Sequence, residues 1–513
     1  MKLRKTSQLI FLFIFLFFFF NTKYTGLDEL PLKVAIFLQL DPLISFSTFL
    51  SERDLSALVS LSLIIVFISI ILGRIFCGWV CPFGTIHDIT SKLVKRRKDP
   101  PNNRYKWKYY ILILLLICSI FALNLSGILD PISILIRSMS ICISPMLDFF
   151  TNFFADSLYA TEVEFIQKIV DYSFSFMKKI FLNFNQQHFI NSGFILLMFI
   201  VLLFLNKISN RFFCKNLCPL GALLGCFSRY SFLRRNLLET CNSCGKCLDN
   251  CKMTIEDETK WARSECLVCL RCREACPSKS IEFTLSLPSK KDQGIDLQRR
   301  KVLVNSVFGL LLVGGIRLNP DENRLISKRI RPPGSVEEPE FKRRCVKCGE
   351  CMRVCLTNVL QPAFLETGIE GLWTPMMDFD SAYCEYYCTL CTQVCPSNAI
   401  EKLSMSEKTK KVIGLAYIDP ARCIPYRDSK NCIVCEEFCP TSPKAIYFEK
   451  VQKYTREGNL KEVMLPKIDY SKCIGCGICE FKCPVYGKKA IYVLPLDKRN
   501  IIKDSESFSD NIY

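Results

Sequence analysis

The chain has 513 residues, of which 31 are cysteine and only 2 are histidine. A disulfide framework is disfavoured, because such frameworks belong mostly to short secreted domains and this chain is long enough to build several cores. The net charge of +18 does not indicate a nucleic-acid partner, since the basic residues lie beside apolar segments and among cysteine motifs rather than in one patch.

Four apolar segments, residues 8–20, 56–76, 109–125 and 190–206, predict transmembrane helices, each about long enough to cross a hydrocarbon layer of roughly 30 Å. The first has no small-residue cleavage site after it, so we interpret it as an anchor rather than a signal peptide. The loop 91–108 carries eight basic residues and one acid, which predicts that it faces the cytoplasm.

These charges predict a multi-pass protein of the cytoplasmic (inner) membrane. The N-terminus lies inside, the loops 21–55 and 126–189 lie outside, and residues 207–298 are cytoplasmic.

The stretch "FCGWVCPFG" after the second segment is repeated as "FCKNLCPLG" after the fourth, and the repeat places Cys77, Cys81, Cys214 and Cys218 at one membrane face. A C-x3-C spacing puts two sulfurs on one helical face, and we expect the following Pro and Gly to end the helix. Small residues at a helix contact are the structural alternative. The spacing leaves open whether this quartet holds a further cluster or acts as redox thiols.

Two cysteine runs follow the fourth segment, "CNSCGKCLDNC" and "CLVCLRCREACP". Both have the C-x2-C-x2-C-x3-C spacing that bacterial ferredoxins use for [4Fe–4S] clusters, in which the fourth cysteine of each run ligates the other cluster. We therefore expect one cluster on Cys241, Cys244, Cys247 and Cys276 and another on Cys251, Cys266, Cys269 and Cys272. Zinc is disfavoured, because three cysteines in such close steps would crowd one tetrahedral ion.

The C-terminal half contains four more runs, which predict four more clusters and six in all. The expected ligands are Cys345, Cys348, Cys351 and Cys355; Cys384, Cys388, Cys391 and Cys395; Cys423, Cys432, Cys435 and Cys439; and Cys473, Cys476, Cys479 and Cys483. Two spacings are irregular, Cys384 to Cys388 and Cys423 to Cys432. Each fourth cysteine could pair with the neighbouring run or in a nested order.

Residues 299–316, "RRKVLVNSVFGLLLVGGI", join two arginines to a short apolar run. The segment is similar to a twin-arginine export signal placed inside the chain. The alternative is a buried cytoplasmic helix, because at 1.5 Å per residue the run is about 22 Å long, which is short for a span. We predict export, with residues 317–513 outside.

The first half, with its two motifs, "DPISILIRS" and "FFCKNLCPLGALLGCFSRYSFLRR", resembles the NapH-type membrane ferredoxins and their NosR-like and CcoG-like relatives. The second half, with "RPPGSVEEPEFKRRCVKCGECMRVC" and "GLWTP", resembles a NapG-type polyferredoxin. Together the two halves look like a NapH–NapG fusion. The resemblance implies quinol oxidation at the membrane and electron delivery through the clusters to a terminal reductase or electron-carrier protein.

The alternative function is an accessory or regulatory protein for the maturation of another metalloenzyme. The number of clusters in series favours electron transfer. The sequence shows no recognisable catalytic acid–base pair, so catalysis beyond electron transfer is not indicated. If the protein has an enzymatic role, we expect it to be a component of a quinol dehydrogenase. His87 and His188 lie on opposite sides of the predicted membrane and no C-x-x-C-H occurs, so no haem is expected. His87 could accept protons from quinol or face solvent.

The predicted fold class is a membrane α-helical bundle of four, possibly five, transmembrane helices plus α+β ferredoxin-like multi-cluster domains. Residues 1–236 form the transmembrane domain, 237–285 the cytoplasmic dicluster domain, 286–340 a linker, 341–500 a four-cluster domain and 501–513 a tail. Cys118, Cys142 and Cys226 lie outside every run and are interpreted as packing residues.

Overall fold

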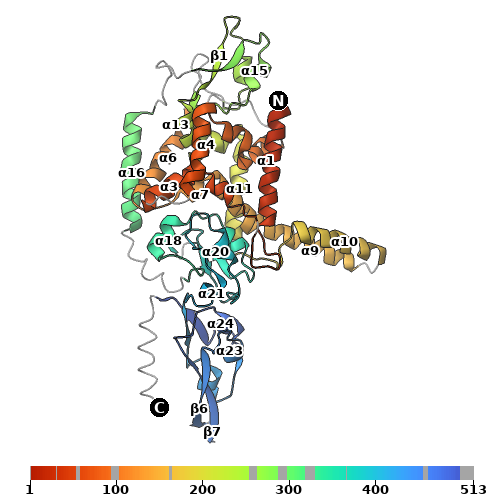
Figure 1. Ribbon diagram of the computed structural model, residues 1–513, viewed down its shortest axis with the longest axis vertical. Coiled ribbons are helices and arrows are strands. Elements are labelled where there is room, and N and C mark those ends of the chain that lie inside the picture. Colours follow the sequence, from red (N-terminus) through yellow and green to blue (C-terminus); the bar gives the residue numbers. More distant parts are fainter. Residues whose placement is uncertain are drawn as a thin grey trace.

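The computed structural model describes the chain except residues 1, 31, 54–57, 94–102, 161–163, 254–262, 287–296, 318–329, 365–366, 455–459 and 497–513. Much of the predicted basic loop 91–108, much of the linker and the whole predicted tail therefore lie outside the described residues. The described chain forms a helical bundle with cysteine-rich units at its two opposite ends (Figure 1). We call residues 233–285 the first unit and residues 330–496 the second unit.

Helices are present in all four predicted apolar segments. They are α1 (Lys2–Asn21), α4 (Leu58–Leu72), α6 (Trp107–Ile120) and α11 (Ser192–Phe204). Two of the described helices are long and apolar enough to cross a membrane, namely Leu3–Asn21 and the continuous helix Pro131–Tyr159. The apolar helices of the other three predicted spans are shorter, so helix length and composition do not confirm four or five spans.

The segment with the two arginines also forms a helix, α16 (Arg299–Arg317), which packs along α6 and runs from one end of the bundle to the other (Figure 1). Its Asn305 side chain donates to the carbonyl of Tyr110 at 2.8 Å. Gly309 lets the helices approach closely, because an added Cβ would lie 3.2 Å from the Leu114 side chain. Residues 299–316 therefore connect the two units along the bundle.

The two segments predicted as long loops contain helices. They include α2 (Ile36–Gln39), α3 (Pro42–Glu52), α7 (Ser126–Leu129), α8 (Pro131–Ser138), the π-helix η3 (Met139–Ile143), α9 (Ser144–Tyr159) and α10 (Glu164–Ile180). Asp41 caps α3 by accepting from the Leu43 amide at 2.8 Å, and Asp130 caps α8 by accepting from the Ser133 amide at 2.7 Å. In both cases proline follows the cap, which is a common helix start.

The first unit is small. β1 (Leu233–Leu237) pairs antiparallel with β2 (Ile281–Leu285), with Leu233 opposite Leu285. Between the strands lie α14 (Lys246–Asp249), η5 (Arg263–Glu265) and α15 (Arg271–Ala275). Since β1 begins at Leu233, the unit starts before residue 237, where the sequence placed the boundary.

The second unit combines short helices with three two-stranded antiparallel sheets among its described residues. The sheets pair β3 (Leu360–Pro362) with β4 (Pro375–Met377), β5 (Leu415–Ile418) with β8 (Ile491–Leu494), and β6 (Ile446–Tyr454) with β7 (Leu460–Ile468). Its helices are α18 (Glu338–Arg344), α19 (Glu350–Arg353), α20 (Leu390–Val394), α21 (Met405–Lys408), α22 (Ile424–Asp428), α23 (Val434–Glu437) and α24 (Ile478–Lys482).

The second unit packs tightly against the bundle. Arg137 of α8 is fully buried, donates to the carbonyl of Lys347 at 3.0 Å and stacks on the Trp373 ring with its guanidinium 4.1 Å from the ring centroid. A Cβ added to Gly127 would lie 2.0 Å from the carbonyl oxygen of Val346. Only glycine allows the two backbones to approach this closely.

Candidate functional site

The four motif cysteines lie at helix junctions. Cys77 is in the π-helix η1 (Phe76–Val80) and Cys81 ends it, while Cys214 is in α12 (Phe212–Asn216) and Cys218 precedes α13. As expected, the helix that carries the cysteines ends before the proline in both motifs. In addition, Pro82 and Pro219 begin new helices, α5 (Pro82–Leu93) and α13 (Pro219–Ser228). Proline suits the first helical position, where its missing N–H costs no hydrogen bond.

The structure brings the quartet together across more than a hundred residues of sequence. Cys81, Cys214 and Cys218 are buried, and each lies close enough to Cys77 for their thiols to interact electrostatically. The two halves are alike in detail, because the amide of Gly84 donates to Cys81 Sγ at 3.5 Å and that of Gly221 to Cys218 Sγ at 3.2 Å.

The glycine that ends each motif and the arginine three residues before its first cysteine also have structural roles. A Cβ on Gly221 would lie 2.6 Å from a guanidinium nitrogen of Arg74, and one on Gly84 would lie 3.1 Å from the carbonyl of Cys77. The two arginines, Arg74 and Arg211, are fully buried. Both carry positive charge close to the quartet. Burial raises the pKa of Cys81 and Cys214, and the charge of Arg211 opposes that rise.

His87 does not face solvent, so that alternative was wrong. Its side chain is fully buried, lies 2.8 Å from the amide nitrogen of Asn206 and packs edge-on against Phe83 with ring centroids 4.6 Å apart. Burial lowers the pKa of His87 to about 4, which leaves the imidazole neutral at pH 7. The His188 carbonyl contacts Gln361 of the second unit at 3.1 Å, at the other end of the bundle.

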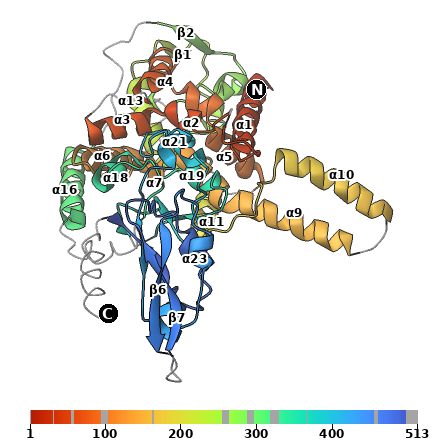
Figure 2. The ribbon, with the colours of Figure 1, turned by 60° about the horizontal axis from the view of Figure 1, so that its bottom comes forward.

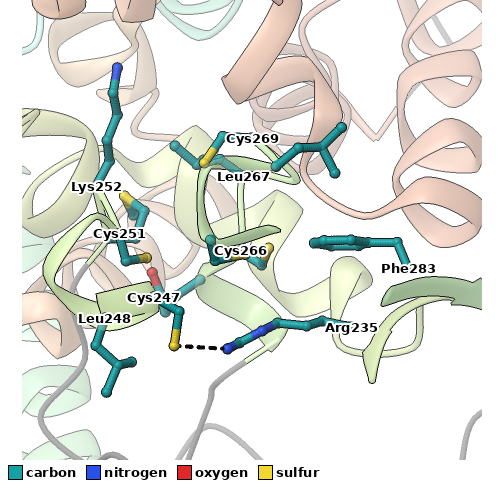
Figure 3. Close-up of a pocket in the computed structure, with 13 residues that line it drawn as sticks. Arg235, Cys247, Leu248, Cys251, Lys252, Cys266, Leu267, Cys269 and Phe283 are labelled. Carbon is teal, nitrogen blue, oxygen red and sulfur yellow. Dashed lines mark hydrogen bonds between the residues drawn. The ribbon is translucent and has the colours of Figure 1, made fainter. Parts of the chain in front are cut away.

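In the first unit, one cavity is lined by five of the predicted ligands (Figure 3). Four of them are Cys251, Cys266, Cys269 and Cys272, the set expected to share a cluster. Cys247 also borders the cavity and accepts a hydrogen bond from Arg235 at 3.3 Å. Cys241 and Cys244 are exposed, and Cys276 lies 3.5 Å from the Ser278 hydroxyl.

In the second unit, three cavities are each lined by three cysteines of one run and the fourth cysteine of the neighbouring run. The sets are Cys345, Cys348, Cys351 and Cys395; Cys423, Cys432, Cys435 and Cys483; and Cys439, Cys473, Cys476 and Cys479. Cys384, Cys388 and Cys391 each lie within electrostatic reach of Cys355. Neighbouring runs therefore exchange their fourth cysteines, and these sets do not follow the nested order.

The backbone of the regular runs fits an anionic cluster. The residue before the second cysteine and the residue after it both have positive φ, as at Lys347 (56°) and Gly349 (85°). The same holds for Ser243 and Gly245, Val268 and Leu270, and Gly475 and Gly477. Such turns direct successive amides into one concavity, a geometry common at iron–sulfur sites. The corresponding positions of the two irregular runs have no positive φ in the described backbone.

The donor sets are all-cysteine. Within the described residues, no group of three or more His, Cys, Asp and Glu side chains lies close enough together to hold a single metal ion. Four cysteines around a cavity fit the four iron corners of a [4Fe–4S] cluster. Hydroxyls also lie near several sulfurs, as between Thr441 and Cys439 at 3.3 Å, and hydrogen bonds to sulfur tune the reduction potential.

The first unit is fixed against the quartet by a buried ionic network around Glu265, the residue before Cys266. Its carboxylate pairs with Arg74 at 3.2 Å and with Lys108, and accepts from the Tyr109 hydroxyl at 2.7 Å. Burial by itself would raise the pKa of Glu265, but the charges of Lys108 and Arg74 lower it below its usual value. The sequence gives no direct signal for this network.

Further contacts join the first unit to the motif itself. The Trp79 indole donates to the carbonyl of Val268 at 3.0 Å, and a Cβ on Gly78 would lie 2.4 Å from the carbonyl of Leu267. Asp88 pairs with Arg211 at 2.8 Å and with Lys252, the residue after Cys251. The quartet and the Cys266 set are therefore direct neighbours.

These cysteine sets define an iron–sulfur electron-transfer protein of the ferredoxin type. A family model described as "4Fe-4S binding domain" matches residues 54–101 and 191–238, the segments that carry the quartet. A "4Fe-4S dicluster domain" matches residues 344–399, and another "4Fe-4S binding domain" matches residues 466–486. No solved structure matches the chain.

Curated relatives agree with this class. The chain is 33% identical over 203 residues to the ferredoxin-type protein NapG of Escherichia coli, covering 39% of this chain and 86% of that protein. It is 34% identical over 206 residues to the methylamine utilization ferredoxin-type protein MauM of Methylorubrum extorquens, covering 38% and 89%. The chain belongs to the NapG/MauM family of ferredoxin-type proteins.

Proposed function

We propose that this protein is a membrane-anchored carrier that takes electrons from quinol and passes them through [4Fe–4S] clusters to a terminal reductase or another electron carrier. The observation that carries the proposal is the placement of the cysteine sets. A ferredoxin-type unit lies at each end of the bundle (Figure 1). One hydrophobic core contains Cys81, Cys214 and Cys218 of the quartet together with Cys348 of the second unit.

We assign six clusters to the six cysteine sets, with Cys355 completing the set of Cys384, Cys388 and Cys391. The quartet is proposed to hold a seventh cluster, because the matching "4Fe-4S binding domain" covers both of its motifs and buried arginines supply positive charge. A bound cluster supplies one-electron transfer. Anaerobically purified protein should then contain about 28 iron atoms, four for each Cys₄ cluster.

The proposed membrane placement follows the exposed surface of the bundle. Large apolar side chains face outward from its helices, including Phe13 of α1, Phe67 of α4, Phe204 of α11 and Leu311 of α16. Apolar exposure on this scale marks a membrane or protein contact. In this arrangement α16 crosses the cytoplasmic membrane, which places residues 207–298 inside and the second unit outside. The first half then serves as a NapH-type module fused to the NapG-type half.

Quinol-driven reduction tests the function. In anaerobic protein, a Cys77→Ala and Cys214→Ala double variant should lose reduction of the clusters by quinol and keep reduction by dithionite. Cys118→Ala is the matched control, since Cys118 is a buried cysteine outside every run. Normal quinol-driven reduction in the double variant would refute the role of the quartet.

Reporter fusions test the placement. A reporter that fluoresces only in the cytoplasm should be bright after residue 290 and dark after residue 513. A bright signal at both sites would mean that residues 299–316 do not cross the membrane.

A further inference from the structure

Helices α9 and α10 project sideways from the bundle side by side, and we call these two helices, residues 144–159 and 164–180, the arm. The arm lies across the direction of α1 and extends beyond the rest of the molecule in both views (Figures 1 and 2). With 16 residues, α9 reaches about 24 Å at 1.5 Å per residue. The long apolar helix Pro131–Tyr159 thus runs along this end of the bundle and into the arm, so it does not span the bundle.

The outer surface of the arm is strongly apolar. In α10, Phe165, Ile169, Tyr172, Phe176 and Ile180 recur at helical spacing and are all exposed, with Phe165 at 72% and Tyr172 at 79%. Residues at this spacing lie on one face of a helix. The aromatic residues of α9 (Phe149, Phe150, Phe153 and Phe154) are exposed as well.

The arm also has a charged edge. Glu164 and Lys168 of α10 pair at 2.7 Å with side chains 82% and 73% exposed, and Asp171 and Lys178 follow with exposed side chains. These positions share a helix face beside the apolar row, at the same 3.6-residue period. A helix with one apolar row and one charged row is typical of segments that lie in a membrane interface.

The base of the arm is held in place by polar contacts. Asn183 donates to Asp148 at 2.7 Å and to Ser144 at 3.2 Å. The Lys23 ammonium, just after α1, donates to the carbonyls of Lys179 and Leu182 at 3.1 and 2.8 Å. Since Lys23 follows the end of α1, these bonds fix the arm at the level where α1 ends.

We propose that the arm lies in the outer interface of the lipid bilayer, with its apolar face among the acyl chains and its charged edge in water. The inference rests on the membrane placement proposed above. Two observations select lipid as the occupant: the arm continues the exposed apolar surface of the bundle, and it lies across α1 at the level where that helix ends. An arm in this position fixes the depth of the second unit above the bilayer.

Depth-dependent quenching tests the proposal on the full chain in nanodiscs of phosphatidylethanolamine and phosphatidylglycerol. A fluorescent amino acid is placed at Tyr172 in one variant and at Lys168 in another, the matched position on the charged edge. A spin label near the top of the acyl chain should quench position 172 at least about twofold more than position 168. Aqueous iodide should quench position 168 more.

A third variant, with the fluorophore at Phe67 of α4, separates the two proposals. If lipid labels quench position 67 and not position 172, the bundle is in the bilayer and the arm inference is wrong. An arm covered by a second copy or by a partner protein would give this result. If they do not quench position 67, the membrane placement itself has failed. Equal quenching at positions 168 and 172 would also overturn the inference.

Discussion

Changing Glu265 to Gln should loosen the first unit from the bundle. The Glu265 side chain is 1% exposed and its cationic partners Arg74 and Lys108 are fully buried. The substitution preserves shape and removes the charge, which leaves two buried cations without their counter-ion. Removing one partner from a buried ion pair costs about 3–5 kcal/mol. Because all three groups are buried, solvent screening does not reduce this figure.

The matched control is Glu164→Gln on the arm, where the carboxylate pairs with Lys168 on an exposed helix face. An exposed pair of this kind contributes only about 0.3–0.5 kcal/mol. Thermal unfolding of the purified protein should therefore show a drop of at least about 12 °C in the midpoint of the first unit for Glu265→Gln, at about 4–8 °C per kcal/mol for a unit of this size. Equal midpoints for the two variants would refute the reasoning.

The wild-type protein and the Glu265→Gln variant also allow a test of pH dependence. The pKa of Glu265 is lowered in the folded protein from its usual 4.5, so folding favours the carboxylate. Its stabilisation is complete above pH 4.5 and is lost as the pH falls through the lowered pKa. Because Glu265 becomes protonated, the difference in midpoint between wild type and Glu265→Gln should shrink as the pH falls below about 4.5.

Three further predictions follow from the cysteine sets and the contacts. Cys483→Ser should remove the same spectroscopic cluster signal as Cys423→Ser, together with about four iron atoms, because both cysteines line one cavity. Electron paramagnetic resonance and iron analysis of the two variants check this prediction. Loss of different signals in the two variants would contradict the pairing. Gly127→Ala should make the second unit more sensitive to protease, because a Cβ there meets the carbonyl of Val346 at 2.0 Å, whereas Gly193→Ala, with open space around it, should have no effect. Oxidative removal of iron should abolish the circular dichroism of the second unit while the helical signal of the bundle remains, since the predicted cluster ligands lie within the buried cores of that unit.

The sequence alone determined the cofactor chemistry and the family. Consecutive C-x2-C steps suit few sites other than iron–sulfur clusters, and cysteines at that spacing are recognisable without any fold. The apolar segments likewise predicted the helices α1, α4, α6, α11 and α16, because continuous apolar stretches of that length favour helix.

Only the tertiary structure decided which distant groups meet. The sequence placed the quartet at one membrane face and left two pairings open for Cys483, and only the fold decided between them. The Glu265 network joins residues far apart in the chain, and the sequence contains no signal for it. The arm was missed for a related reason. Residues 126–189 were interpreted as a loop from their acidity and hydropathy. Asp130 instead caps a helix that continues through α9, and α10 packs against α9. Burial of His87 depended in the same way on Phe83, Phe213 and Asn206, which the fold places around it.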